Sequence, residues 1–285
     1  MHARSFVAFA LVLVLVAATP VVAQDFPKYG DEIYQPQYGQ AGKDVIWIPT
    51  PDALVTRMLQ MAKVTDQDLV YDLGAGDGKI PIAAAKQFGA RAVGIEYNPD
   101  MAGLAKRNAE RAGVADKVTI IHGDIFKEDF TKATVITLYL LPALNQQLRP
   151  QILKMKAGTR VVSHAFHMGE WEPDDVFQVE ARDGFLWIVP ASVEGRWNIR
   201  DQGSSLDATV DITQKFQRIG GTITIRGKTQ PLLGAYVTGP NLGFTFVDAD
   251  GGVRSVRATI DGTTLKGTLR FAGALSDITG RRIDL

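Results

Sequence analysis

The chain has 285 residues, 46% of them hydrophobic, which is enough to bury one large core or two smaller ones. Basic and acidic residues balance at 31 each, so no overall field would draw the protein to nucleic acid, and nucleic acid is not an expected partner. Because the chain contains no cysteine, disulfides, thiolate metal sites and a cysteine nucleophile are excluded.

The first 23 residues have the pattern of a secretory signal peptide. His2 and Arg4 precede an apolar run over residues 6–18, and Val21-Val22-Ala23 is a small-residue cleavage pattern before Gln24. The alternative is an uncleaved N-terminal membrane anchor, although the run is shorter than the ~20 residues that span a bilayer. We therefore expect an exported, periplasmic protein with no membrane span after cleavage.

Residues 24–43 are expected to form an extended arm that covers the following domain, because they combine three tyrosines and two prolines with no sustained period. A helix is predicted to follow, with Thr50 as its N-cap and Pro51 at its first position. Trp47, between the arm and this helix, could cover a ligand or pack within the arm.

From residue 69 onward, short β-branched segments alternate with helical segments at about 30 residues per unit. One helix is capped by Asn98 and ends at Gly113, and another runs from Pro142 to Gly158 with a kink at Pro150. The expected strands are LVYDL (69–73), AVGIE (92–96), VTIIHGD (118–124), TVITLYL (134–140) and RVVSHA (160–165). This α/β pattern predicts a doubly wound, mostly parallel sheet.

A hairpin of FQVEA (177–181) and FLWIVPA (185–191), turning at Arg182-Asp183-Gly184, is expected to bring this sheet to seven strands. Half of the 28 glycines fall after residue 191, where alternating runs predict a small antiparallel meander or partial barrel. The predicted domains are therefore 44–191 and 192–285. Turns in the second are expected at Asp201-Gln202-Gly203, Asp250-Gly251-Gly252 and Asp261-Gly262.

The stretch YDLGAGDGKI, residues 71–80, joins the first expected strand to a helix. Glycine permits close approach to a ligand and positive φ, and a helix N-terminus attracts an anion. A dinucleotide fingerprint would need glycine in place of Lys79, and a phosphate-binding P-loop would need Ser or Thr in place of Ile80. With both phosphate motifs broken, the pattern that remains is an acid within the strand followed by three glycines: Asp72, Gly74, Gly76 and Gly78. This pattern suits a ligand with an ammonium group beside a carboxylate.

Two further acids lie where the rest of such a ligand would need them. Glu96 ends the second strand, the position from which a carboxylate accepts both hydroxyls of a ribose. Asp124, at the expected end of the third strand, can accept from an adenine amine, while Ile125 packs on the ring and Tyr97 lies on the adenine face. An amino acid, a ribose and an adenine together make S-adenosylmethionine.

These motifs resemble those of the class I, seven-strand S-adenosylmethionine-dependent methyltransferases, over residues 44 to about 191. YDLGAGDG resembles the first motif of that family, GIEYNP the acidic second-strand motif and HGDIF the adenine-side motif. VIWIPTP further resembles the non-SET protein lysine methyltransferases. The resemblance implies a Rossmann-like fold, S-adenosylmethionine as cofactor, and SN2 methyl transfer to a nucleophile, above all a protein lysine.

Methyl transfer mainly needs a positioned nucleophile, so a catalytic side chain is hard to find in a sequence. Tyr139 is the candidate, because the resemblance places the acceptor-side motif there, although Leu140-Leu141-Pro142 follows where many members carry Asn or Asp with prolines.

A metal site could be considered at His164, His167 and Glu170. These three residues lack the further ligands that a metal site needs, so no metal is expected, and His164 is interpreted as a rim histidine.

Two other functions stay open: an exported protein that binds an adenosyl compound without turnover, and a small-molecule methyltransferase whose β domain covers the acceptor pocket. Export conflicts with activity, because S-adenosylmethionine is made in the cytoplasm and an exported enzyme would need a supply of it outside. The presence of the complete acid and glycine set favours retained cofactor binding. The methyl acceptor, a protein or a small molecule, is not fixed by the sequence.

Overall fold

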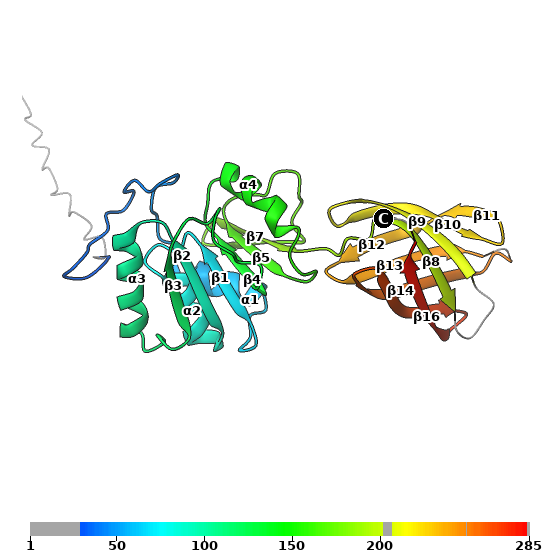
Figure 1. The fold of residues 1–285 in the computed structure, drawn as a ribbon, viewed down its shortest axis with the longest axis horizontal. Coiled ribbons are helices and arrows are strands. Elements are labelled where there is room, and N and C mark those ends of the chain that lie inside the picture. The colour runs from blue at the N-terminus through cyan, green and yellow to red at the C-terminus, as the bar shows by residue number, and fades with distance from the viewer. Residues whose placement is uncertain (1–28, 202–206, 249, 284–285) are drawn as a thin grey trace, which may run out of the picture.

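The computed structural model describes residues 29–201, 207–248 and 250–283, which form two sheets arranged side by side (Figure 1). The predicted signal peptide and most of the predicted turn Asp201-Gln202-Gly203 lie outside the described residues. Within the described ranges, no helix combines the length and apolar character needed to cross a membrane.

The first sheet has seven strands in the order β3-β2-β1-β4-β5-β7-β6. Strands β1 to β5 pair in parallel, and β7 pairs antiparallel with both β5 and β6. The predicted doubly wound, mostly parallel sheet with an edge hairpin is therefore confirmed. The bounds are β1 Leu69–Leu73, β2 Arg91–Glu96, β3 Val118–His122, β4 Val135–Leu138, β5 Arg160–His164, β6 Asp175–Val179 and β7 Arg182–Ile188.

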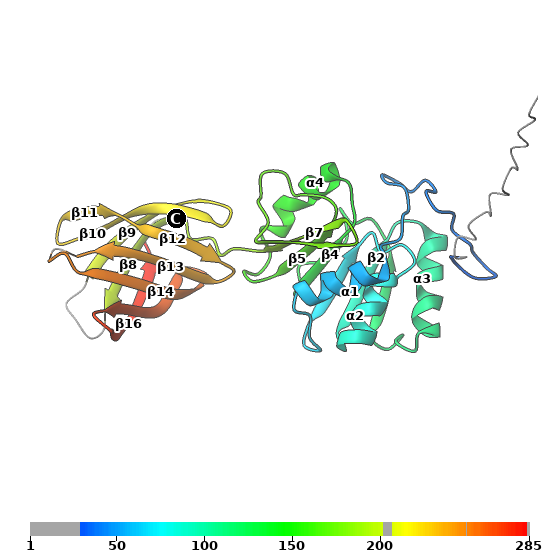
Figure 2. The same cartoon turned by 180° about the vertical axis from the view of Figure 1, so that it is seen from behind.

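Helices cover both faces of this sheet (Figures 1 and 2). One face carries α1 (Asp52–Met61), α2 (Lys79–Phe88) and α3 (Pro99–Arg111), and the other carries α4 (Pro142–Ile152). In β1, Val70 packs with the first group of helices, whereas its neighbours Leu69, Tyr71 and Leu73 pack on the side of α4. This alternation follows from the two-residue side-chain period of a strand, and it leaves both faces apolar.

Two helix ends differ from the sequence prediction. Pro51, not Thr50, is the N-cap of α1, because the Thr50 side chain is buried with its Oγ1 3.2 Å from Nδ1 of His164. Helix α4 ends at Ile152 instead of Gly158 and contains Pro150 in its last turn. The chain then tightens into i→i+3 hydrogen bonds at Lys154 and Met155, a common way for a helix to end.

The β6–β7 hairpin turns at Glu180-Ala181, so the predicted turn at Arg182-Asp183-Gly184 was wrong. Glu180 and Ala181 have φ values of 49° and 60°, and Val179 pairs directly with Arg182. A two-residue turn with positive φ matches the twist of the two strands even without glycine. Gly184 is needed elsewhere: it lies under the ring of Phe177, which a Cβ would overlap.

The second sheet has nine antiparallel strands in the order β11-β10-β9-β8-β16-β15-β14-β13-β12. Near the two edges of this sheet, β10 contacts β12 and β11 contacts β13, so the sheet is a nearly closed barrel around Trp197, Phe244 and Phe246. The predicted partial barrel is confirmed. The bounds are β8 Gly195–Asp201, β9 Asp207–Lys215, β10 Arg218–Ile225, β11 Lys228–Pro231, β12 Leu233–Thr238, β13 Asn241–Val247, β14 Val253–Asp261, β15 Thr264–Phe271 and β16 Ala274–Arg282.

The barrel contacts the loop that follows β5. Phe216 stacks on Trp171 with ring centroids 6.2 Å apart, and Lys215 pairs with Glu170 at 2.8 Å. The barrel therefore lies at the end of the molecule away from α3 and the arm (Figure 1).

Candidate cofactor site

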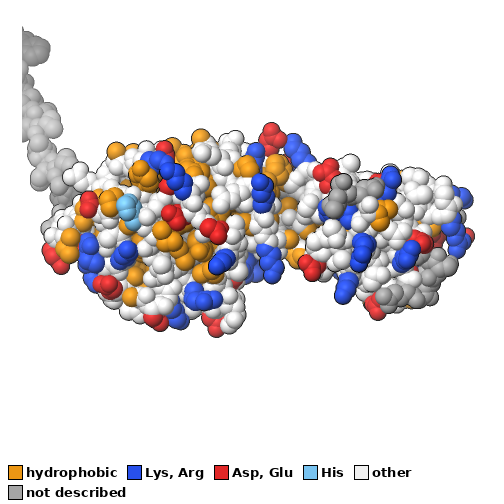
Figure 3. Space-filling view, viewed as in Figure 1, with side chains coloured by type: hydrophobic (Ala, Val, Ile, Leu, Met, Phe, Trp, Pro, Cys, Tyr) orange, Lys and Arg blue, Asp and Glu red, His pale blue; other side chains and the backbone are white. Residues whose placement is uncertain are grey.

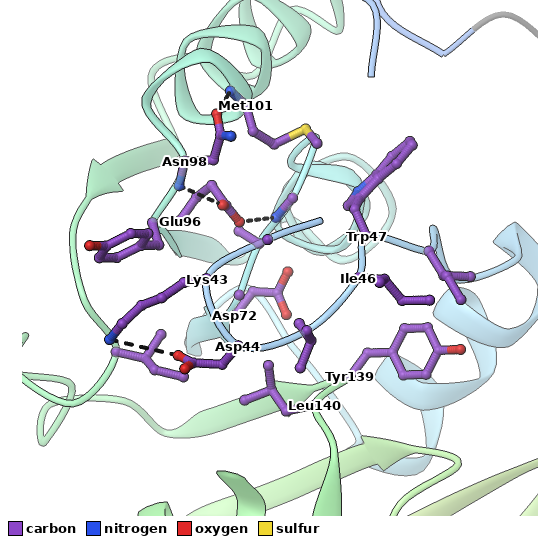
Figure 4. Close-up of a pocket in the computed structure, with 18 of the residues that line it drawn as sticks. Lys43, Asp44, Ile46, Trp47, Asp72, Glu96, Asn98, Met101, Tyr139 and Leu140 are labelled. Atoms are coloured by element: carbon purple, nitrogen blue, oxygen red, sulfur yellow. Dashed lines mark hydrogen bonds and ion pairs between the residues drawn. The ribbon is translucent and has the colours of Figure 1, made fainter. Parts of the chain in front are cut away.

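A cavity of about 710 Å³ opens at the carboxyl ends of β1, β2 and β4 (Figure 4). Its position is dictated by topology, because the strand order reverses between β1 and β4, and ligands of open α/β sheets bind at such a point. All of its lining residues fall between Gln40 and Phe166, so no described residue of the barrel reaches it.

Eight of the nine predicted site residues line this cavity: Asp72, Gly74, Gly76, Glu96, Tyr97, Asp124, Ile125 and Tyr139. Asp124 and Tyr139 lie just beyond the ends of β3 and β4, not within the strands as expected. Gly78 is the exception. It caps α2 with φ 82°, and a Cβ there would approach Ala105 of α3 to 3.0 Å, so it lets the loop pack on a helix. The ligand contacts of these residues stay predictions.

Asp72 is the most deeply buried acid of the cavity, at 2% exposure. Its Oδ1 accepts a 2.7 Å hydrogen bond from Thr137, and none of the described lysines or arginines forms an ion pair with it. Burial raises the pKa of Asp72 to about 7; the Thr137 hydrogen bond opposes this rise, and the charges of Glu96 and Asp77 add to it. A carboxylate buried without a cation fits a ligand that brings an ammonium group.

Glu96 is fixed by two backbone N–H groups at the end of β2. Its Oε2 accepts from Gly76 N and its Oε1 from Asn98 N, both at 2.8 Å (Figure 4). Asn98 in turn caps α3 by accepting from the N–H groups of Asp100 and Met101, as predicted. Each Glu96 oxygen keeps a lone pair for one more donor, which suits the two hydroxyls of a ribose.

The carboxylate of Asp124 forms an ion pair with Lys43, a residue of the arm. Its Oδ1 accepts from Phe126 N at 3.1 Å, and its Oδ2 pairs with Lys43 Nζ at 3.0 Å. These two interactions hold the pKa of Asp124 below its usual range. Lys43 also lies 5.0 Å from the ring centroid of Tyr97. Lys43 was not predicted as a site residue, because a lysine in an irregular segment belongs to no motif or period.

The arm forms one side of the cavity. Residues 40–50 line it, with the side chains of Ile46 and Trp47 facing the glycine loop and Tyr139 (Figure 4). The Trp47 indole nitrogen lies 2.7 Å from where a Cβ on Gly76 would stand, and Gly76 has φ 55°. Only glycine at position 76 therefore allows both the turn and the close approach of Trp47.

An acid at the start of the arm fixes it to α3. The Asp31 side chain, 2% exposed, accepts from Arg107 Nε at 2.6 Å and from Arg111 Nη1 at 3.1 Å. The Arg107 hydrogen bond is the main reason that the pKa of Asp31 lies well below its ordinary value. Residues 29–43 of the predicted arm are thus fixed against the domain beside the site.

The three residues considered for a metal are not brought together. His164 is buried against Tyr139, whereas Glu170 pairs with Lys215 of the barrel. In the described part of the chain, no group of three or more His, Cys, Asp or Glu side chains is arranged to hold a metal ion.

Fold and site together define a class I S-adenosylmethionine-dependent methyltransferase, and comparison with known proteins agrees. Residues 72–175 match the ANTKMT methyltransferase domain. A protein-lysine N-methyltransferase of Saccharolobus islandicus is 46% identical over 138 residues, which cover 48% of this chain and 86% of that enzyme. The adenine nucleotide translocase lysine N-methyltransferase of Mus musculus is 38% identical over 106 residues, 36% of this chain but only 46% of that enzyme.

Among solved structures, an RNA methyltransferase from Salinibacter ruber in complex with S-adenosyl-L-homocysteine is 49% identical, with a TM-score of 0.50. The match covers 51% of this chain and 96% of the Salinibacter protein. The chain therefore belongs to the class I S-adenosylmethionine-dependent methyltransferases, and S-adenosylmethionine is its cofactor.

Cofactor affinity is expected to fall about tenfold per pH unit between pH 7 and pH 5. Asp72 carries a proton below its raised pKa, and this proton must leave before the carboxylate can pair with the cofactor ammonium. Calorimetry of S-adenosylhomocysteine binding, in two buffers of different ionisation enthalpy, measures the released proton. Thr137→Val removes the hydrogen bond that lowers the pKa of Asp72, so the fall in cofactor affinity should begin at a higher pH. A flat profile, or one that Thr137→Val leaves unchanged, contradicts this assignment.

Asp31→Asn is expected to loosen the arm, because the charge that pairs with Arg107 and Arg111 is lost. Trypsin should then cleave after Lys43 several-fold faster, and S-adenosylhomocysteine should bind several-fold more weakly, although Asp31 does not line the cavity. The matched control is Asp211→Asn, which removes an exposed ion pair with Arg196 on the barrel. Equal cleavage and affinity in the two variants would show that the arm does not depend on Asp31.

Proposed function

We propose that this methyltransferase modifies the side-chain amine of a protein lysine. When bound, S-adenosylmethionine supplies the methyl group that the amine nitrogen takes up in an SN2 displacement. The chain itself has to hold the cofactor, admit the acceptor from one direction and exclude water.

The shape of the acceptor end carries this proposal. Because the strands lie in the order β3-β2-β1-β4, the residues at their carboxyl ends lie in the order Asp124, Glu96, Asp72, Tyr139 along the cavity. An adenine at Asp124 and a ribose at Glu96 leave the end at Tyr139 for the acceptor. The lining there is apolar and aromatic, and it consists of Ile46, Tyr139, Leu140, Leu141, Leu144 and Phe166.

A lysine side chain suits such a lining. Its aliphatic stem packs on apolar walls, and desolvation lowers the pKa of its amine, so that the neutral nucleophilic form becomes accessible. The names of the Saccharolobus and mouse relatives, both lysine N-methyltransferases, support the same acceptor.

RNA is the second acceptor to test, because the similar Salinibacter structure is named as an RNA methyltransferase. Charge gives this alternative no support: basic and acidic residues are equal in number, and both signs are interspersed on the face shown in Figure 3. Binding of RNA normally relies on a basic surface that contacts phosphates.

Methyl-labelled S-adenosylmethionine with poly-L-lysine, an envelope protein extract or unmodified transfer RNA separates these acceptors. We expect label as methyl-lysine after acid hydrolysis, and none in RNA. Tyr139→Ala should lower kcat by more than about tenfold, because a displaced acceptor loses alignment, whereas Tyr139→Phe keeps the ring and stays within a few-fold. Tyr236→Ala, at a partly exposed tyrosine of the barrel, is the control. Label in RNA, or in none of the three probes, refutes a lysine acceptor.

We further propose that the enzyme is exported to the periplasm. The support is the sequence of residues 1–23, with charged residues ahead of a short apolar run and a small-residue cleavage pattern. N-terminal sequencing of the protein from a periplasmic fraction is expected to begin at Gln24. An intact N terminus in the membrane fraction would favour the anchor, and recovery in the cytoplasm alone would refute export.

A further inference from the structure

A strained turn lies beside the acceptor end of the cavity. Ala165, directly after β5, has φ 63°, and Phe166 N donates to His164 O at 2.8 Å across it. A three-residue turn with positive φ at a residue other than glycine is rare and costs free energy. The conformation is also fixed from outside the turn, because Ala165 N donates to Asp183 O at 2.9 Å. Such strain persists only where the surrounding structure imposes it, and it is common at functional sites.

This turn brings two rings onto Tyr139. The His164 ring stacks on the Tyr139 ring with centroids 3.7 Å apart and planes at 27°. The Phe166 ring lies 6.1 Å from Tyr139 with planes at 19°. Tyr139 and Phe166 both line the cavity, whereas His164 is only 4% exposed and lies behind the lining. The three-residue turn centred on Ala165 places residues 164 and 166 close enough to reach the same tyrosine.

The His164 ring is itself held in place. Its Nδ1 lies 3.2 Å from Oγ1 of Thr50, a buried residue at the entrance to α1. Burial, with a smaller contribution from the charge of Arg182, lowers the pKa of His164 to about 4. The ring is therefore neutral near pH 7, and it does not repel an incoming amine.

We propose that His164 and Phe166 are positioning residues that fix the ring of Tyr139 at the acceptor end, and that the strained turn at Ala165 serves to present both rings. The inference deepens the proposed function, on which it depends for the identity of the acceptor. Contacts with two other rings limit the movement of the Tyr139 ring, so the width of the channel is fixed and the acceptor amine is aligned for transfer.

The first test follows the Tyr139 ring without any turnover. The seven tyrosines are replaced by 3-fluorotyrosine, and the ¹⁹F signal of Tyr139 is assigned as the one missing from Tyr139→Phe. Phe166→Ala and Ala165→Gly are expected to shift or broaden this signal, and Phe166→Trp, which keeps an aromatic ring and adds no fluorine, is expected to retain it. The matched control is Ala272→Gly: Ala272 also has positive φ, 46°, but lies at the β15–β16 turn of the barrel.

The second test separates positioning from stability. Glycine accepts positive φ without strain, so neither Ala165→Gly nor Ala272→Gly should lower the thermal midpoint. Ala165→Gly and Phe166→Ala are nevertheless expected to reduce kcat for poly-L-lysine by about tenfold and to leave the Kd of S-adenosylhomocysteine unchanged, whereas Ala272→Gly changes neither quantity.

An unchanged Tyr139 signal in both Phe166→Ala and Ala165→Gly overturns the proposal, and so does full activity in these variants. A wild-type enzyme that labels neither lysine nor RNA refutes the proposed function instead. The ¹⁹F experiment still decides the positioning of Tyr139 in that case, because it needs no acceptor.

Discussion

The buried carboxylate of Asp72 is the constraint around which the site is arranged. An acid that leaves water without a cation is unfavourable in its charged form, and the side-chain donor that Asp72 has among the described residues is the neutral hydroxyl of Thr137. The glycine loop keeps the space before this acid open, because a side chain at Gly74 or Gly76 would contact Leu140 or Trp47. Burial of Asp72 without a cation is therefore unfavourable in the free protein, and pairing with a ligand ammonium group offsets that cost.

The order of the strands determines where Asp72 lies along a bound ligand. Four adjacent strands place Asp124, Glu96, Asp72 and Tyr139 at their carboxyl ends, so these residues line one edge of the sheet although they are far apart in the sequence. Glu96 and Asp124 accept hydrogen bonds from backbone N–H groups, which fix the orientation of both carboxylates. Asp72 receives no backbone hydrogen bond that the structure shows, and this difference suits it to the ammonium group of the cofactor.

The two parts that lie outside the central sheet play unequal roles at the cavity. The arm supplies lining residues and is held at two places, by Asp31 on α3 and by Lys43 on Asp124. The barrel supplies none of the described lining, yet its Phe216 packs on Trp171 in the loop that follows β5. That loop begins with the strained turn at Ala165, so the barrel supports the segment from which the acceptor wall is built.

Local sequence determined much of this protein: the order of strands and helices, the Asn98 cap, the glycine loop and the acids that end the strands all follow from spacing and residue type. These features depend on neighbours in the chain, whose effects a sequence pattern records. Tertiary structure decided the rest. It moved the β6–β7 turn to Glu180-Ala181 because Gly184 is needed under Phe177, brought Lys43 to Asp124, and placed His164 and Phe166 on Tyr139. Each of these contacts joins residues whose pairing depends on how the sheet, the arm and the loops pack, and no local pattern encodes that packing.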